Sequence, residues 1–408
     1  MNFRSQKKQI AIVLFMMVTL GQLGVDLYLP SMPHIATSLH SSVSLIKLTI
    51  PLYLLGFGVS QLFYGPISDN IGRKPILHFG LALFLISSLG ALFSTNALML
   101  IVFRTLQGLG IGAAIVNVRA VMRDAFHGKQ MAKVSAQIAM TWSVTPIVAP
   151  VFGGYIQSYL GWRVNFSAMF FYAALAWLLI FLLLPETLDR NHRKLLHIHA
   201  VLKTYKNIFT DKVFLSFSLM SALCYGYLIS YATASPFLFQ TQLGLTPVQY
   251  GWAILAIACG TVMGSIICSR VVSYVKITHI IFLGSFLMVA STCILFFLSL
   301  SGVFNAFSLL IPPFFATLGG GMVLPNCTTG AMTHYKKNAG VAGASLGFVQ
   351  MSISFCFSMI ISRLPTKNSF PLSIELLIIS ILIFFLFLFY IQPRFQEELG
   401  ETAQHTKN

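Results

Sequence analysis

The chain has 408 residues, of which 56% are hydrophobic and only 9% are charged, and its formal net charge is +16. Soluble domains carry roughly 25% charged residues, so this composition excludes a water-soluble globular protein and indicates a protein of the lipid bilayer. The positive charge does not indicate a nucleic-acid-binding protein, because the basic residues lie in short loops between apolar runs rather than on one polar domain.

Apolar runs of about 20 residues recur along the whole chain, and each is long enough to cross a hydrocarbon core about 30 Å thick. Lipid offers no partner to free backbone groups, so each run must be helical. The expected spans are 9–32, 45–65, 76–94, 98–121, 131–155, 164–185, 213–238, 248–270, 278–299, 305–328, 340–364 and 371–391. The fold class is therefore an all-α membrane protein with about twelve transmembrane helices.

The longest polar segment between spans divides the chain into two sets of six spans. We predict an N-terminal six-helix half at 1–185, a basic cytoplasmic central loop at 186–212, a C-terminal six-helix half at 213–392 and a cytoplasmic tail at 393–408. Two pseudo-symmetric halves joined in this way are typical of a duplicated transporter. No loop is long enough to hold a soluble catalytic domain.

Basic residues are distributed unevenly between the two sides of the membrane. With the N-terminus inside, the outer segments hold only Lys47, Arg163, Arg363 and Lys367 of the 26 Lys and Arg residues. Arg104 lies within a span, and the other basic residues are assigned to the inside. By the positive-inside rule, both termini are predicted to face the cytoplasm. The six cysteines lie in apolar runs without a C-x-x-C pair, so we expect packing residues and no metal site.

Asp26 is interpreted as the one carboxylate well inside a span, since Glu375 is placed near the outer end of the last span. An ionisable residue in a span costs roughly 2.5–3.5 kcal/mol even on the lenient insertion scale, so it needs a compensating role. Asp26 and Arg104 reach similar depths in the outer half of the membrane. One interpretation is a structural ion pair, and the other is a proton carrier that moves between buried and solvated surroundings.

The loop after the second predicted span carries a motif with the spacing G-x3-D-x2-G-R-K. It consists of Gly65, Asp69, Gly72, Arg73 and Lys74. Glycines permit a tight turn and a close helix approach, and the charges can form a cluster that latches the inner face in one state. This pattern resembles the signature loop of the major facilitator superfamily, which implies that family's twelve-helix fold and transport function.

Two further motifs resemble those of proton-coupled members of the same superfamily. Arg104, followed by Gln107-Gly108-x-Gly110, resembles the fourth-helix motif, whose arginine is implicated in proton transfer. Residues 146–154 resemble the fifth-helix antiporter motif, which implies export rather than uptake. Its positions here are Pro146, Pro150, Gly153 and Gly154, and Ala149 replaces a common glycine. Proline and glycine at this place favour a close, bendable interface between the halves.

The segment 26–33 reads D-L-Y-L-P-S-M-P and looks like the motif of the bicyclomycin-resistance (Bcr/CflA) branch of drug:proton antiporters. The second half is similar as well, at Gly244–Pro247 and Gly340–Gln350. The resemblance implies that Asp26 is the protonation site and Arg104 its partner. It also implies that the proton is the coupling ion and that no cofactor is needed.

A substrate cavity is expected between the halves near the midplane of the membrane. Candidate residues are aromatic or carry an amide, which suits amphipathic ligands. They are Tyr28, Tyr53, Gln61, Gln107, Trp142, Tyr225, Tyr231, Asn326 and Gln350.

The predicted function is proton-coupled antiport, in which small amphipathic molecules such as drugs and antibiotics are exported by alternating access. The partners are this substrate, protons and the lipid bilayer; we expect a monomer that binds no nucleic acid. The main alternative is a dedicated exporter of an endogenous metabolite such as a siderophore. An uptake symporter is disfavoured by the fifth-helix motif. A membrane enzyme lacks motif support, and a receptor would need a sizeable extramembrane domain.

Overall fold

A computed structural model describes residues 3–188, 198–335 and 339–393 of the chain. Within these ranges the structure is helical, and twelve helices or helix combinations are long and apolar enough to cross a membrane. The predicted fold class is therefore confirmed. The central segment 186–212 was expected to be a loop, but part of it forms a helix, α9 (Ile198–Thr210).

The first six spans form what we call the N half. They are α1 (Phe3–Asp26) with η1 (Leu29–Ser31) and α2 (Met32–Ser38), α3 (Val43–Lys47) with α4 (Thr49–Ile71), α5 (Arg73–Leu92), α6 (Ala97–Ala125), α7 (Gly128–Leu160) and α8 (Trp162–Leu183).

The last six spans form the C half. They are α10 (Lys212–Pro236) with η3 (Phe237–Gln242), α11 (Pro247–Val271), α12 (Ile277–Leu300), α13 (Ala306–Met332) with η4 (Thr333–Tyr335), α14 (Ala339–Arg363), and α15 (Phe370–Leu386) with η5 (Phe387–Ile391).

Several helices extend beyond the apolar runs because polar residues cap them outside the hydrocarbon. Asn96 starts α6 by accepting a hydrogen bond from the Met99 amide. Thr246 and Gln249 form a capping box at the start of α11. Such caps satisfy amide groups that the first helical turn leaves free. Hydropathy marks only the membrane core, so a helix can continue beyond its apolar run: α7 spans Gly128–Leu160 rather than 131–155, although no side chain caps its first turn.

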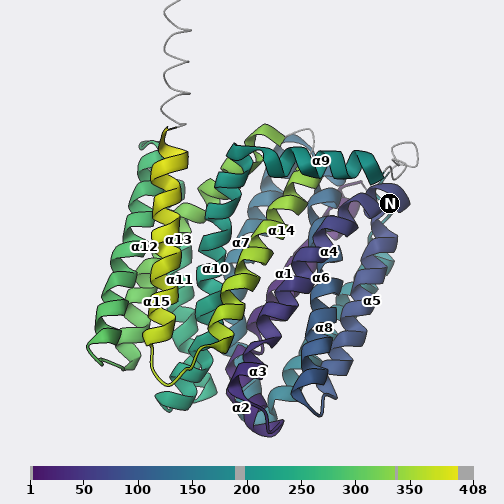
Figure 1. The fold of residues 1–408 in the computed structure, drawn as a ribbon. Helices are drawn as coiled ribbons and strands as arrows, with labels where there is room; N and C mark the ends of the chain where they lie inside the picture. Colours follow the sequence, from purple (N-terminus) through teal and green to yellow (C-terminus); the bar gives the residue numbers. More distant parts are fainter. Residues whose placement is uncertain (1–2, 189–197, 336–338, 394–408) are drawn as a thin grey trace, which may run out of the picture.

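The two halves lie side by side, and the N-terminus is at the same face of the bundle as α9 (Figure 1). We call this the α9 face, and the opposite one the α2–α3 face. Helix α14 packs against α4, and α11 packs against α7, so these two helix pairs join the halves. Large apolar side chains such as Phe63, Phe79 and Phe152 are exposed on the bundle, as expected for a surface that faces lipid.

Helix α9 lies across one face of the bundle and contacts both halves (Figure 1). The Tyr205 hydroxyl donates a hydrogen bond to the Leu62 carbonyl of α4 at 2.8 Å. The Phe209 ring lies against Phe348 of α14, with 6.1 Å between the ring centroids. Burial, together with the nearby Asp69 carboxylate, raises the pKa of Tyr205, so its hydroxyl remains a donor. The linker is thus packed onto the halves that it connects.

Candidate functional site

Asp26 is the last residue of α1, where the chain leaves the helix and turns into η1. Its side chain is half-buried although it lies deep within the span Gln6–Ser38. It interacts electrostatically with Tyr53 of α4 and with Tyr225 and Tyr250 of the C half. The carboxylate therefore lies where α1 meets both α4 and the C half. Among the described residues, no ion pair joins Asp26 to a basic side chain.

Arg104 is completely buried in α6 and is held by groups other than Asp26. One guanidinium nitrogen donates to the Gln107 Oε1 atom at 2.7 Å, and another donates to the Gly24 carbonyl at 2.6 Å. The guanidinium carbon lies 4.3 Å from the ring centroids of both Tyr28 and Tyr53. Cation–π attraction and two charged hydrogen bonds thus stabilise the cation without a carboxylate. The structure places Arg104 against the turn of α1 that precedes Asp26.

Polar contacts fix the aromatic residues that sandwich Arg104. The Tyr28 hydroxyl lies 3.1 Å from Thr49 Oγ1, and the Tyr53 hydroxyl donates to the Gly21 carbonyl at 3.4 Å. Gln107 donates to Ser88 Oγ at 2.7 Å. The Gln107 amide therefore accepts a hydrogen bond from Arg104 and donates one to Ser88, both within the N half. These two bonds orient the Arg104 guanidinium.

The fifth-helix motif places α7 between α1 and α11. The Leu27 carbonyl lies so close to Gly153 that a Cβ atom there would overlap it. Toward the C half, the backbone of Pro247 in α11 leaves no room for a Cβ atom at Gly154 of α7. Gly251 of α11 in turn lies close to the Pro150 carbonyl of α7. Gly153 therefore lets the backbone of α7 contact Leu27, the residue after Asp26. Gly154 lets the backbone of α7 contact the backbone of α11 in the C half.

We predict that Gly154→Ala lowers transport strongly, because the added methyl group must push α11 away from α7. Overpacking of a tight contact typically costs about 1–3 kcal/mol. Export rate and thermal unfolding of the purified protein would measure the effect. Gly226→Ala is the matched control, since a Cβ atom there has no neighbour closer than 3.7 Å. Equal transport by the two variants would contradict the prediction.

The signature loop forms a charge cluster inside the N half. Arg73 forms an ion pair with Asp69 in the last turn of α4 and donates to Asp124 at the end of α6 at 3.2 Å. The backbone amides of Arg73 and Lys74 donate to the Glu186 carboxylate at 2.9 and 3.1 Å. Glu186 thus caps the first turn of α5, where a negative charge is favourable. The cluster ties α4, α5, α6 and the segment after α8 into one unit.

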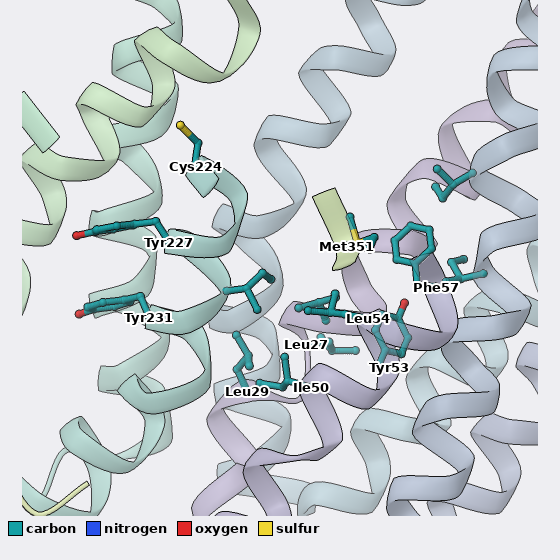
Figure 2. Packing of buried hydrophobic residues seen from close by; sticks show 14 of the residues in the cluster. Leu27, Leu29, Ile50, Tyr53, Leu54, Phe57, Cys224, Tyr227, Tyr231 and Met351 are labelled. Atoms are coloured by element: carbon teal, nitrogen blue, oxygen red, sulfur yellow. The ribbon is translucent and has the colours of Figure 1, made fainter. Parts of the chain in front are cut away.

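The predicted cavity residues do not share one place. The Tyr231 hydroxyl donates to the Leu309 carbonyl of α13, and its ring points away from Tyr53 and the N half (Figure 2). Asn326 donates to Cys268 Sγ and to the Met322 carbonyl. Both side chains form their hydrogen bonds within the C half rather than across the contact between the halves, and their place in a substrate cavity stays a prediction.

Other predicted cavity residues do lie at or near the contact between the halves. Gln61 of α4 is buried against Gly347 of α14, and neither polar atom of its amide has a hydrogen-bond partner. Gln350 donates to Ser221 Oγ at 3.4 Å, which links α14 to α10. Trp142 and Tyr225 are partly buried.

An open groove of about 440 Å³ lies at the α2–α3 face rather than at the midplane. Residues of α2, the following turn, α3 and η3 line it: Pro33, Ala36, Thr37, His40, Ser41, Val43, Phe237 and Thr241. None of the predicted cavity residues is among them.

Two charged residues within the spans were misjudged from the sequence. Glu375 is only 5% exposed, accepts a hydrogen bond from Ser230 at 2.7 Å and has one oxygen without a partner. Asp26 is therefore not the only carboxylate that is shielded from solvent within a span. Lys47 was counted among the basic residues of the outer side, but it is 0% exposed and donates to two carbonyl groups of the C half. The sequence did contain a signal for a buried Glu375, because this residue falls inside the predicted span 371–391.

The two six-span halves and the buried charged residues at their contact define a multi-pass membrane transporter. The chain belongs to the Major Facilitator Superfamily, whose family model matches residues 14–361. This confirms the predicted family and the prediction of a transporter rather than an enzyme.

Relatives and solved structures agree with this assignment. The chain is 30% identical to the uncharacterized MFS-type transporter YdgK of Bacillus subtilis, over 87% of this chain and 89% of the relative. It is 26% identical to multidrug resistance protein D of Escherichia coli (93% and 95%) and 25% identical to a bicyclomycin resistance protein homolog of Haemophilus influenzae (86% and 87%). The xylose transporter XylE from E. coli, in a partially occluded inward open conformation, shares the fold with a TM-score of 0.71 at 13% identity, over 95% and 98% of the two chains.

Proposed function

We propose that this protein is a proton-coupled antiporter that exports small amphipathic molecules, including drugs and antibiotics, by alternating access. Relatives named for multidrug, bicyclomycin and chloramphenicol resistance cover 86% or more of the chain and support this cargo class. The observation that carries the proton coupling is the half-buried Asp26 at the meeting point of α1, α4 and the C half. A carboxylate in a span is costly, and proton exchange gives it a role.

In this mechanism, release and uptake of a proton at Asp26 are coupled to the binding and release of cargo. Movement of the halves changes the surroundings of Asp26 because its neighbours Tyr225 and Tyr250 belong to the C half. Arg104 stays with the N half and holds the end of α1 through the Gly24 carbonyl. The two states must differ in their affinity for proton and cargo, since equal affinities would give no coupling. The proton is the coupling ion, and the protein acts as a monomer.

We also propose that the α9 face is cytoplasmic, in the inner membrane of a bacterium. The signature-loop cations Arg73 and Lys74 and the α9 residues Lys203 and Lys206 belong to this face, as the positive-inside rule requires. Both termini are then cytoplasmic.

Expression in a bacterium that lacks its own major efflux pumps tests the cargo. The host is expected to tolerate higher concentrations of several unrelated amphipathic antibiotics, and a protonophore is expected to remove the difference in drug accumulation. Drug accumulation that the protein leaves unchanged across the panel would contradict drug export. Protonophore-resistant export would contradict proton coupling. Release of a siderophore by the same cells would instead identify a dedicated exporter.

A further inference from the structure

Helix α14 of the C half is bonded near both ends by cationic side chains of the N half. Lys47 of α3 donates to the carbonyls of Ile361 and Leu364 at 2.8 and 2.7 Å. Arg119 of α6 donates to the carbonyl of Gly343 at 2.5 Å. The first contact lies at the α2–α3 face and the second toward the α9 face. One helix of one half is thus held at two places by the other half.

The Lys47 contact is built as a specific site rather than as a surface contact. The side chain is 0% exposed, so its ammonium has exchanged water for the two carbonyls. These carbonyls belong to the last turn of α14 and the residue after it, where the helix dipole favours a positive charge. The buried Glu375 of α15 also attracts Lys47 electrostatically. Withdrawing Lys47 would leave buried acceptors without a donor, which is costly.

The Arg119 contact is weaker by the same criteria. Among the described residues, Arg119 makes one hydrogen bond to α14, and Gly343 lies near the N-terminal end of that helix, where the dipole disfavours a cation. A Cβ atom at Gly343 would meet the Arg119 guanidinium, so a larger residue there would displace this side chain. The same face is also bridged by α9 through Tyr205. At the α2–α3 face, Gln240 of η3 adds one bond to the Pro30 carbonyl at 3.0 Å.

Movement of the halves in alternating access opens one face while the other stays closed. We propose that the bonds of Lys47 to the C-terminal end of α14 hold the α2–α3 face closed, and that the bond of Arg119 near the N-terminal end of α14 holds the α9 face closed. We call these two contacts latches. Because the Lys47 latch is the stronger, the protein at rest keeps the α2–α3 face closed and opens more readily at the α9 face. This inference rests on the alternating access of the proposed function but not on its cargo.

Distances between spin labels in the full-length protein, reconstituted in lipid nanodiscs without cargo, test the two latches. The native cysteines are replaced first. One pair of labels, at Ser44 and Asn368, reports on the α2–α3 face; the other, at Ala132 and Tyr274, reports on the α9 face. All four positions are exposed.

Lys47→Met is expected to raise the population of long distances across the α2–α3 face severalfold and to leave the α9 face closed. Arg119→Met is expected to do the reverse, with a smaller shift. The controls Lys367→Met and Lys133→Met each remove an exposed lysine and are expected to change neither distance. If Lys47→Met does not assemble, Lys47→Gln, which keeps an amide donor, is measured instead and is expected to shift the same pair of labels.

Unchanged distances in both latch variants would overturn the proposal, and so would a shift of the same face by both. Cargo transport is measured in parallel. Shifted distances without any drug export would refute the proposed function and keep the latches. Proton-driven drug export with unshifted distances would refute the latches alone.

Discussion

Asp26→Asn is expected to abolish proton-driven efflux while cargo binding and facilitated exchange remain. Asparagine has nearly the same shape as aspartate but cannot bind and release a proton, so it removes the coupling and not the site. Asp26 makes no ion pair among the described residues, and its neutral replacement leaves no basic partner unpaired. The fold should therefore tolerate the change better than loss of a buried pair, which costs about 3–5 kcal/mol.

Proton release from purified protein on addition of an amphipathic antibiotic measures the coupling directly. Wild type should release protons and Asp26→Asn should not, although both bind the drug. Asp26→Glu is the matched control, because it restores a carboxyl group and should recover part of the release. Equal release by wild type and Asp26→Asn would assign the coupling to another group, and Glu375 is the other carboxylate buried within a span.

The sequence predicted the twelve helices because hydropathy and length alone decide which segments can cross a bilayer. It did not predict α9, since a short amphipathic helix owes its stability to packing rather than to composition. Here Tyr205 and Phe209 supply that packing by contacting α4 and α14.

The sequence brought Asp26 and Arg104 to the same depth, but it did not predict the contacts around them. Depth along the helices placed Asp26 and Arg104 at the same level, and the structure indeed holds Arg104 against the α1 turn at Gly24. Sequence distance could not reveal that Tyr28 and Tyr53 enclose the guanidinium. Such contacts depend on how helices rotate about their axes, which is set by close approaches such as Gly108 against the Tyr53 backbone.

Lys47 and Glu375 were missed for a related reason. Both lie within about two turns of a span end, where a sequence alone favours a solvated position because long side chains can reach water. In the structure, Lys47 instead extends into the C half, and Glu375 turns toward Ser230 of α10. Only the packing of the helices, between the halves for Lys47 and within the C half for Glu375, distinguishes an exposed charge near a helix end from a buried one.

Arg104→Met is expected to lower both stability and transport strongly. The change leaves the Gln107 oxygen and the Gly24 carbonyl without their donor in a completely buried site. An unsatisfied buried acceptor costs about 1–3 kcal/mol, so the two together give a loss of about 2–6 kcal/mol. Thermal unfolding of the protein in detergent, with Arg163→Met as the control, measures this loss. Arg163 is exposed, stacks on Trp162 and donates one hydrogen bond to the Ser94 carbonyl at 3.2 Å, so its removal should cost much less than that of the completely buried Arg104.

Arg104→Lys separates the charge of the guanidinium from its shape. A lysine keeps the positive charge near Tyr28 and Tyr53, but it lacks the planar fork that reaches Gln107 and Gly24 together. If the fork holds the end of α1 in place, Arg104→Lys should transport nearly as poorly as Arg104→Met, although it unfolds at a higher temperature. Full transport by Arg104→Lys would show that the charge alone is required, and that the position of Asp26 does not depend on the bond to Gly24.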